Sequence, residues 1–127
     1  MWNVPCKVMC RQHLLGEHLE MHMFAGAIMT GKKIDGYITN GLVDTRLIFH
    51  RHQKIVMEMY RRGYKHKSPF NIETLVKLIR LRFEGQGEVN VMKNLGVLRE
   101  RCPECRKLII EGDKRVLEVL GIRNSGV

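Results

Sequence analysis

The sequence has few of the features that mark a membrane span, a secreted scaffold or a disordered segment. It has 3 Pro, 4 Cys and 1 Trp among 127 residues. Its longest stretch without Asp, Glu, Lys or Arg runs from Met21 to Gly31, far short of the roughly 20 apolar residues that cross a bilayer. Charged residues such as Lys7, Arg11 and Glu17 interrupt the N-terminal region. We therefore expect no secretory signal, no membrane partner and a cytoplasmic location.

The composition is that of an ordinary globular protein. Hydrophobic residues make up 44% of the chain and charged residues 28%, which is too apolar for intrinsic disorder. No internal repeat or linker is visible, and the length falls within the range of roughly 100 to 200 residues that one domain usually takes. We expect a single domain over residues 1–127, present as a monomer.

The excess of positive charge is concentrated in the middle of the chain. The net charge is +9, and residues 31–70 carry nine basic against three acidic side chains. A basic region of this size attracts polyanions and binds them by releasing counterions, so double-stranded DNA is the leading partner. The competing interpretation is a charged surface that only keeps the protein soluble.

Apolar residues recur at helical spacing through most of the sequence, and no segment alternates with the period of a strand. This pattern predicts an all-α, compact, single-domain fold. The first helix should span residues 11–29 and a second should follow a cap at Asp44 and end at Gly63. A loop is expected around residues 36–41. Further helices are expected over 71–83, over 90–110 with Pro103 kinking or dividing it, and over 113–120.

One face of the second predicted helix is basic, and the turn that follows it has more donors of the kind that bind phosphate. We expect this surface to contact the DNA backbone. An ordinary solvated face is the alternative interpretation. The predicted DNA-binding residues are Arg51, Lys54, Arg61, Arg62, Lys65 and Lys67.

The cysteines form two close pairs, near the two ends of the chain. The pairs are Cys6 with Cys10 and Cys102 with Cys105. Four thiolates could bind zinc if the fold brought them together, and small buried apolar side chains are the alternative. A second possible metal site uses His18 and the histidine four residues later, but the metalloprotease pattern requires Glu directly after the first His. We therefore expect no metal and no cofactor.

The first predicted helix carries a polar seam on one face. His13 and Glu20 are seven residues apart, almost two helical turns, and Glu17 lies between them on the same side. A carboxylate beside apolar surface suits general acid or base chemistry. An ordinary solvated surface would produce the same pattern.

Two segments resemble a known family of DNA repair enzymes. The first runs from Gln12 to Glu20 and reads QHLLGEHLE, and the second runs from Arg51 to Tyr64 and reads RHQKIVMEMYRRGY, continuing into KHKSP. The first is similar to the first-helix motif of the pyrimidine-dimer DNA glycosylase and abasic-site lyase family, the phage endonuclease V type. The second resembles that family's later basic helix with its glycine-ended turn. The resemblance covers roughly residues 1–70.

The resemblance implies both a fold and a reaction. The fold would be helical, with the N-terminus packed among the helices. The α-amine of Met1 would attack the anomeric carbon of a damaged nucleotide, forming a Schiff base that breaks the strand by β-elimination. Glu20 would be the acid and His13 would assist it, with no metal required. As a class, α-amines titrate at roughly pH 7.7 to 8.0, so a useful fraction is nucleophilic near neutrality. The alternative function is a non-catalytic nucleic-acid-binding protein on the same scaffold.

Overall fold

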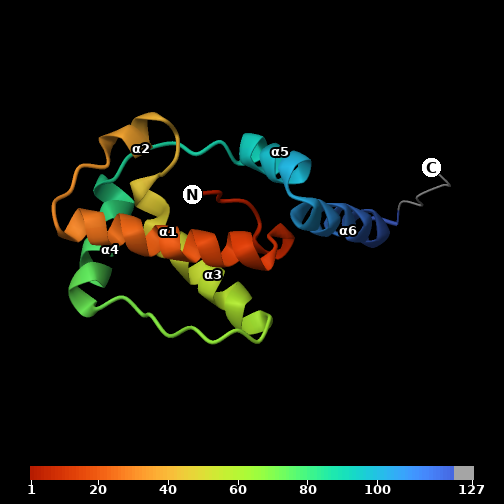
Figure 1. Ribbon diagram of the computed structural model, residues 1–127, viewed down its shortest axis with the longest axis horizontal. Coiled ribbons are helices and arrows are strands. Elements are labelled where there is room, and N and C mark those ends of the chain that lie inside the picture. Colours follow the sequence, from red (N-terminus) through yellow and green to blue (C-terminus); the bar gives the residue numbers. More distant parts are fainter. Residues whose placement is uncertain (122–127) are drawn as a thin grey trace.

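The computed structural model describes residues 1–121, and every regular element in this part of the chain is helical. Figure 1 shows the arrangement. Two short 3-10 turns, Cys6–Val8 and Thr45–Leu47, precede longer helices. The helices are α1 (Arg11–Met29), α2 (Asp35–Thr39), α3 (Ile48–Arg61), α4 (Ile72–Glu84), α5 (Val91–Arg101) and α6 (Pro103–Val119). The predicted all-α fold is confirmed.

Side chains cap the starts of α4, α5 and α6. Asn71 accepts a hydrogen bond from the backbone N–H of Thr74 and begins α4, and Asn90 begins α5 in the same way. Such caps satisfy backbone donors that have no partner inside the helix. Asp44 also caps as predicted, but it caps the 3-10 turn that leads into α3. The predicted start of the second helix was therefore early by one short turn.

Two predictions about the helices were wrong. Residues 36–41 were expected to form a loop, whereas Asp35–Thr39 form α2, a helix too short to produce a periodic pattern. Residues 113–120 were expected to form a separate helix, whereas α6 continues through Gly112 to Val119. An interior glycine costs about 1 kcal/mol, which a continuing helix offsets easily. Pro103 divides the chain as predicted, because it occupies the first turn of α6, where it needs no N–H partner.

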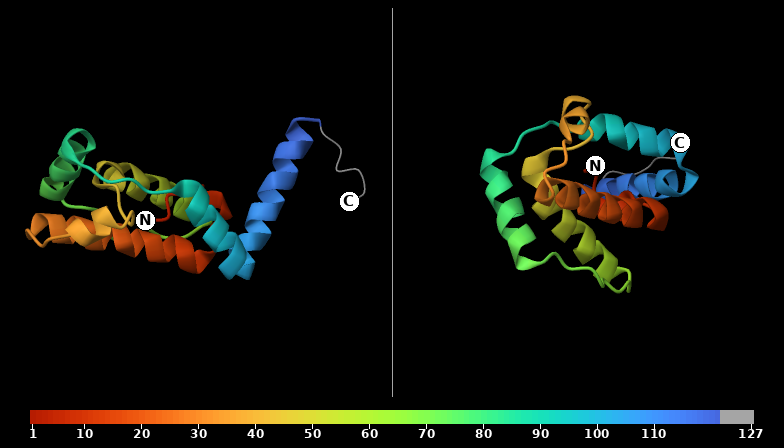
Figure 2. Two further views of the ribbon diagram at one scale, coloured as in Figure 1. Left: turned by 90° about the horizontal axis from the view of Figure 1, so that it is seen from above. Right: turned by 60° about the vertical axis from the view of Figure 1, so that its left-hand side comes forward.

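The core lies between α1, α3 and α4. Its fully buried side chains include Leu14, Met21, Phe24, Ile55 and Leu78. Helices α5 and α6 pack against each other, and α6 also contacts the turn at Cys6–Val8. Figure 2 shows that the far end of α6 projects away from the other helices. No helix among residues 1–121 has the length and apolar character needed to cross a membrane.

The first ten residues form an N-terminal arm that is packed into the fold rather than lying on its surface. Met1 is 7% exposed, and Val4 and Met9 are fully buried within the same apolar cluster as the helices. The prediction that the N-terminus packs among the helices is therefore confirmed. The amino group of the chain has a fixed position as a result.

Candidate functional site

The α-amine of Met1 lies against the side chain of Glu20. The ammonium group forms an ion pair with Oε1 of Glu20 and donates a second hydrogen bond to the carbonyl oxygen of Leu42, at 2.8 Å. The amide of Asn94 donates to the carbonyl oxygens of Met1, at 3.4 Å, and of Trp2, at 2.9 Å. Residues from α1, α5 and the segment after α2 thus hold the first residue in place.

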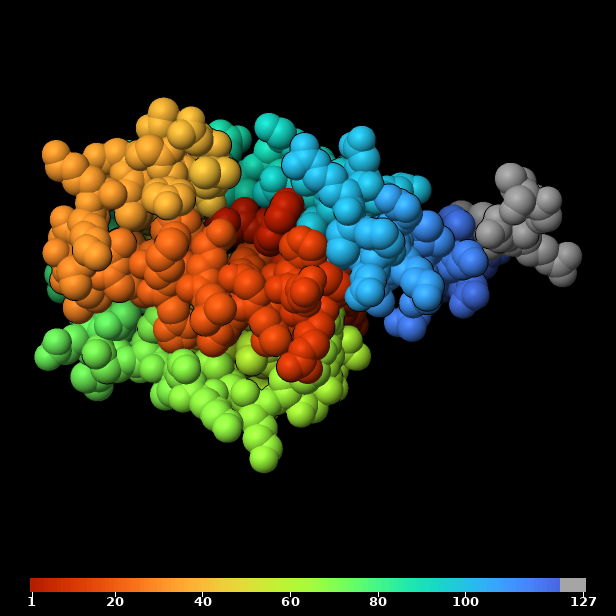
Figure 3. All heavy atoms as spheres, viewed as in Figure 1, coloured from red at the N-terminus to blue at the C-terminus, as the bar shows by residue number. Residues whose placement is uncertain are grey.

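This site is open to solvent on one side. The side chain of Glu20 is 37% exposed, and on the same helix Leu19 and Met23 are exposed apolar residues that flank it in sequence. Figure 3 shows the first residues of the chain, in dark red, visible between the spheres of α1, of the α2 region and of α5. A substrate could approach the amine from this face.

A buried ion pair between Glu17 and Arg51 contacts the N-terminal arm. Arg51 donates from Nε to Oε2 of Glu17 at 2.6 Å and from Nη2 to Oε1 at 2.9 Å, and each residue is 2% exposed. The backbone N–H of Asn3 donates to the same carboxylate at 3.4 Å. Asn3 has φ of +54°, an uncommon conformation that Asn tolerates better than most residues. Arg51 therefore joins α3 to α1 and to the N-terminal arm, and little of its side chain is accessible to a ligand.

Arg62 also binds the N-terminal arm. Its Nη2 donates to the carbonyl oxygens of Cys6, at 3.0 Å, and of Met9, at 2.7 Å, while its Nε donates to Glu58 at 2.8 Å. Arg61 donates to the same carboxylate, and its side chain is 56% exposed. Burial raises the pKa of Glu58, but the hydrogen bonds from Arg61 and Arg62 outweigh burial, so the pKa lies below its usual value. Both guanidinium groups are hydrogen-bonded to Glu58, and Arg61 is the more exposed of the two.

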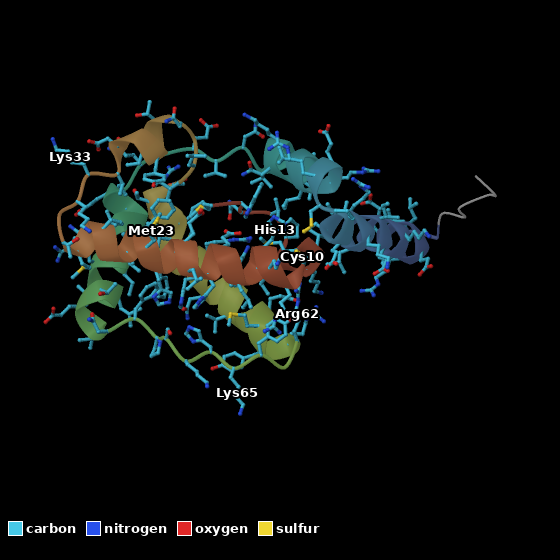
Figure 4. All side chains as sticks on the ribbon, in the orientation of Figure 1. Cys10, His13, Met23, Lys33, Arg62 and Lys65 are labelled. Carbon is cyan, nitrogen blue, oxygen red and sulfur yellow. The ribbon has the colours of Figure 1, made fainter. Side chains whose placement is uncertain are left out.

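A basic groove begins at Asn3, two residues after the amine. The N-terminal arm, α3 and the start of α5 form its walls, which also carry apolar side chains such as Val4 and Met57. Its basic lining residues are Lys7, Lys54, Arg61 and Arg51, and Arg51 is almost completely buried. Lys7 was not among the predicted DNA-binding residues, because in the sequence it is far from the basic segment. Lys65 and Lys67 lie in the segment between α3 and α4. In Figure 4 the side chain of Lys65 points away from the helices at the edge of the molecule.

His13 lies in a cluster with three cysteines. Its Nδ1 is 3.1 Å from Sγ of Cys10 and 3.6 Å from Sγ of Cys105, and Figure 4 shows His13 and Cys10 together at the start of α1, beside α6. Its ring packs edge-on against Trp2, with centroids 5.6 Å apart. Within residues 1–121, no hydrogen bond joins His13 to the Met1 amine or to Glu20. Cys6, which the sequence grouped with the other cysteines, is outside this cluster.

A hydrogen bond from the backbone N–H of Cys105 lowers the pKa of Cys102, whereas burial raises the pKa of Cys105 to about 12. Both thiols therefore have perturbed pKa values, in opposite directions. The cluster draws its members from the starts of α1 and α6.

Four histidines form a second cluster between α1, α3 and the segment that follows α3. They are His18, His22, His52 and His66. Burial is the main cause that lowers the pKa of His18 and of His52 to about 4, and the neighbouring imidazoles add to it. These two rings are therefore neutral at physiological pH. The spacing of His18 and His22 was visible in the sequence, but nothing there linked them to His52 and His66.

The fold and this site define a helical protein whose N-terminal amine is held against a carboxylate and whose N-terminal arm lines a groove with basic residues. A family model described as pyrimidine dimer DNA glycosylase matches residues 1–72, more than half of the chain. The chain belongs to this family, as the resemblance in the segments that form α1 and α3 indicated. Searches among curated proteins and among solved structures found no match.

Proposed function

We propose that the protein is a DNA glycosylase and abasic-site lyase that acts on damaged duplex DNA, with pyrimidine dimers or abasic sites as substrates. The observation that supports this most directly is the contact between the Met1 amine and Glu20. A nucleophilic amine needs a base to deprotonate it and a substrate that can reach it. Here the carboxylate touches the ammonium group and is itself partly exposed.

In the proposed reaction, Glu20 takes a proton from the ammonium group of Met1. The free amine attacks C1′ of the damaged nucleotide, the C1′–N bond breaks, and Glu20 returns the proton to the departing base. The new secondary ammonium then gives a proton to the ring oxygen O4′, the C1′–O4′ bond breaks, and the nitrogen lone pair forms the C1′=N bond of a ring-opened, protonated Schiff base. Removal of a C2′ proton then breaks the C3′–O bond, and water releases the sugar product from the amine. At an abasic site the C1′ hydroxyl leaves as water in place of the base.

The surroundings of the amine fit a nucleotide that has left the base stack. Leu19 and Met23 present exposed apolar surface beside Glu20, and apolar side chains can replace the stacking that an extruded nucleotide loses. We propose that Lys7, Lys54 and Arg61 bind backbone phosphates, with Lys65 and Lys67 extending the contact. Arg51 and Arg62 are left out of this set because their guanidinium groups hold the N-terminal arm.

Borohydride trapping tests the proposed nucleophile. The protein is incubated with a duplex that contains one abasic site, reduced with borohydride, and digested for mass spectrometry. We expect a covalent adduct on the peptide that contains Met1, and almost none after a glycine is added before Met1, since the amine then moves away from Glu20. Binding of the duplex without an adduct would refute the lyase and would support the non-catalytic DNA-binding protein.

Glu20→Gln tests the carboxylate, and Glu100→Gln is the matched control because Glu100 is an exposed residue on α5. We expect Glu20→Gln to reduce strand cleavage by at least about 100-fold, the lower range for loss of a positioned acid or base. Glu100→Gln should cleave like the parent protein. Equal cleavage by all three proteins would remove Glu20 from the mechanism.

A further inference from the structure

We propose that Cys10, His13, Cys102 and Cys105 bind a structural zinc ion. Cys10 Sγ is 3.1 Å from His13 Nδ1 and 3.9 Å from Cys102 Sγ, and the four ligand atoms all lie within 4.8 Å of one another. With Zn–S near 2.3 Å and Zn–N near 2.0 Å, neighbouring ligand atoms of a tetrahedral site are about 3.5 to 3.8 Å apart. The four donors are therefore already close to the spacing that the ion requires.

The backbone around the sulfur atoms favours thiolates. The N–H of Cys10 donates to Sγ of Cys105 at 3.2 Å, and the N–H of Cys105 donates to Sγ of Cys102 at 3.4 Å. Cys10 and Cys102 are the N-cap residues of α1 and α6, where the helix dipole stabilises negative charge. Each pair of ligands has the same spacing, Cys10 with His13 and Cys102 with Cys105. Two short metal-binding turns thus face each other.

Such an ion would join the two ends of the fold. Cys10 ends the N-terminal arm, and Cys102 lies between α5 and α6, so coordination would tie α6 to the start of α1. Trp2 packs on the ring of His13, so the ion would also fix the residue that follows the amine. All four positions are taken by protein ligands, which is the arrangement of a structural site and not of a catalytic one.

Metal analysis of the protein purified without a chelator tests the site. Cys102→Ser should lose one equivalent of zinc, and Cys6→Ser, which alters a cysteine outside the cluster, should keep it. After exchange with Co²⁺, the parent and Cys6→Ser proteins should show sulfur-to-cobalt charge-transfer absorption in the near ultraviolet, and Cys102→Ser should lose most of it. Absence of both zinc and this absorption in the parent protein would overturn the proposal, as would a disulfide between Cys10 and Cys102.

Separate observations on the cluster of four histidines support a second inference. His52 Nε2 is 3.2 Å from His22 Nε2. In the part of the chain that the structure describes, the buried Nε2 atoms of His18 and His66 have no hydrogen-bond partner. Buried polar atoms without a partner are rare because each costs free energy. One cation at the centre would satisfy all four rings.

We infer that these four imidazoles bind a divalent transition-metal ion such as Zn²⁺. Their ligand atoms lie within 4.8 Å of one another, and nitrogen ligands about 2.0 Å from a tetrahedral ion are about 3.3 Å apart. Imidazole suits zinc, copper, iron and nickel ions. Phe70 covers two of the rings, with its centroid 4.4 Å from that of His22 and 4.3 Å from that of His52. The ion would be enclosed.

This ion would fix the segment between α3 and α4 against the body of the protein. His66 is the ligand from that segment, and Lys65 and Lys67 are its direct neighbours in sequence. Metal binding would therefore order two of the proposed phosphate contacts. This consequence for DNA rests on the proposed function, whereas metal content can be measured without any DNA.

The two sites serve as controls for each other. The parent protein, reconstituted with Zn²⁺ alone, should bind two equivalents, and His66→Gln should bind one while keeping the sulfur-to-cobalt absorption of the first site. His50→Gln, which changes an exposed histidine on α3, should bind two. Retention of that absorption shows that His66→Gln is folded. Two equivalents in His66→Gln would overturn the second inference and leave the first intact.

Discussion

The buried ion pair between Glu17 and Arg51 predicts how much stability the protein loses when one of the two charges is removed. Glu17→Gln removes the negative charge and leaves the guanidinium of Arg51 buried without its counter-ion. Both side chains are almost completely buried and joined by two hydrogen bonds of 2.6 and 2.9 Å. Removing one partner of such a pair typically costs about 3 to 5 kcal/mol. For a chain of this size we expect the free energy of unfolding to fall by about that amount.

Equilibrium unfolding in urea, followed by circular dichroism, measures this change. Glu100→Gln makes the same chemical change at an exposed position and should alter the free energy of unfolding by less than about 0.5 kcal/mol. A loss below 1 kcal/mol in Glu17→Gln would show that Arg51 reaches water in solution. The reasoning that removes Arg51 from the DNA-binding surface would then fail.

A double variant separates the charge effect from the packing effect. Glu17→Leu with Arg51→Met replaces both charges by apolar side chains, and such replacements of buried pairs are often neutral or stabilising. We expect the double variant to regain most of the stability that Glu17→Gln loses. It should also bind duplex DNA with the affinity and salt dependence of the parent protein, since neither side chain contacts a phosphate in the proposed function.

Three further predictions concern the basic groove and its supports. Lys54→Ala should weaken duplex binding regardless of sequence and reduce the slope of log affinity against log salt by about one unit, with no change in melting temperature. Arg62→Lys should lower the free energy of unfolding by about 1 to 3 kcal/mol, because one ammonium group cannot replace the guanidinium on a carboxylate and two carbonyl groups. The pKa of Glu58 is lowered in the folded protein, so its contribution to stability is present above the unfolded pKa and lost as pH falls through the folded value. Urea midpoints measured from pH 6 to pH 3 should decrease in this window for the parent protein and less for Glu58→Gln.

Local signals in the sequence predicted most of the helices correctly. The helical spacing of apolar residues such as Leu14 and Leu15 predicted α1 over residues 11–29, and the helix expected over 71–83 matches α4 within one residue at each end. Helix α2 could not be predicted because five residues make barely more than one turn. The sequence predicted a break near Gly112, because glycine and charged residues are common where helices end. In the structure the backbone continues as one helix from Pro103 to Val119.

The candidate site was only partly predictable. The pairing of Met1 with Glu20 was expected from the family resemblance, and the structure places the two groups in contact. Arg51 was assigned to the surface because its own helix has a basic face, and only the packing of α3 on α1 brings it to Glu17. His13 was expected to assist at the Met1 amine because it shares a helix face with Glu20 and because of the family resemblance. Its proximity to Cys105, 92 residues away, depends on α6 returning to the start of α1.

These contacts share one consequence, which is the position of the chain-terminal amine. A terminus normally frays because few contacts oppose its conformational entropy. Here Glu17 holds the backbone at Asn3, Arg62 holds the carbonyls of the N-terminal arm, and the Cys10 and His13 cluster lies where that arm enters α1. None of these anchoring groups is assigned a step in the proposed reaction, yet each restricts where the nitrogen of Met1 can be. The proposed nucleophile at Met1 would need such anchors, because fixed geometry between reacting groups supplies much of a catalyst's rate.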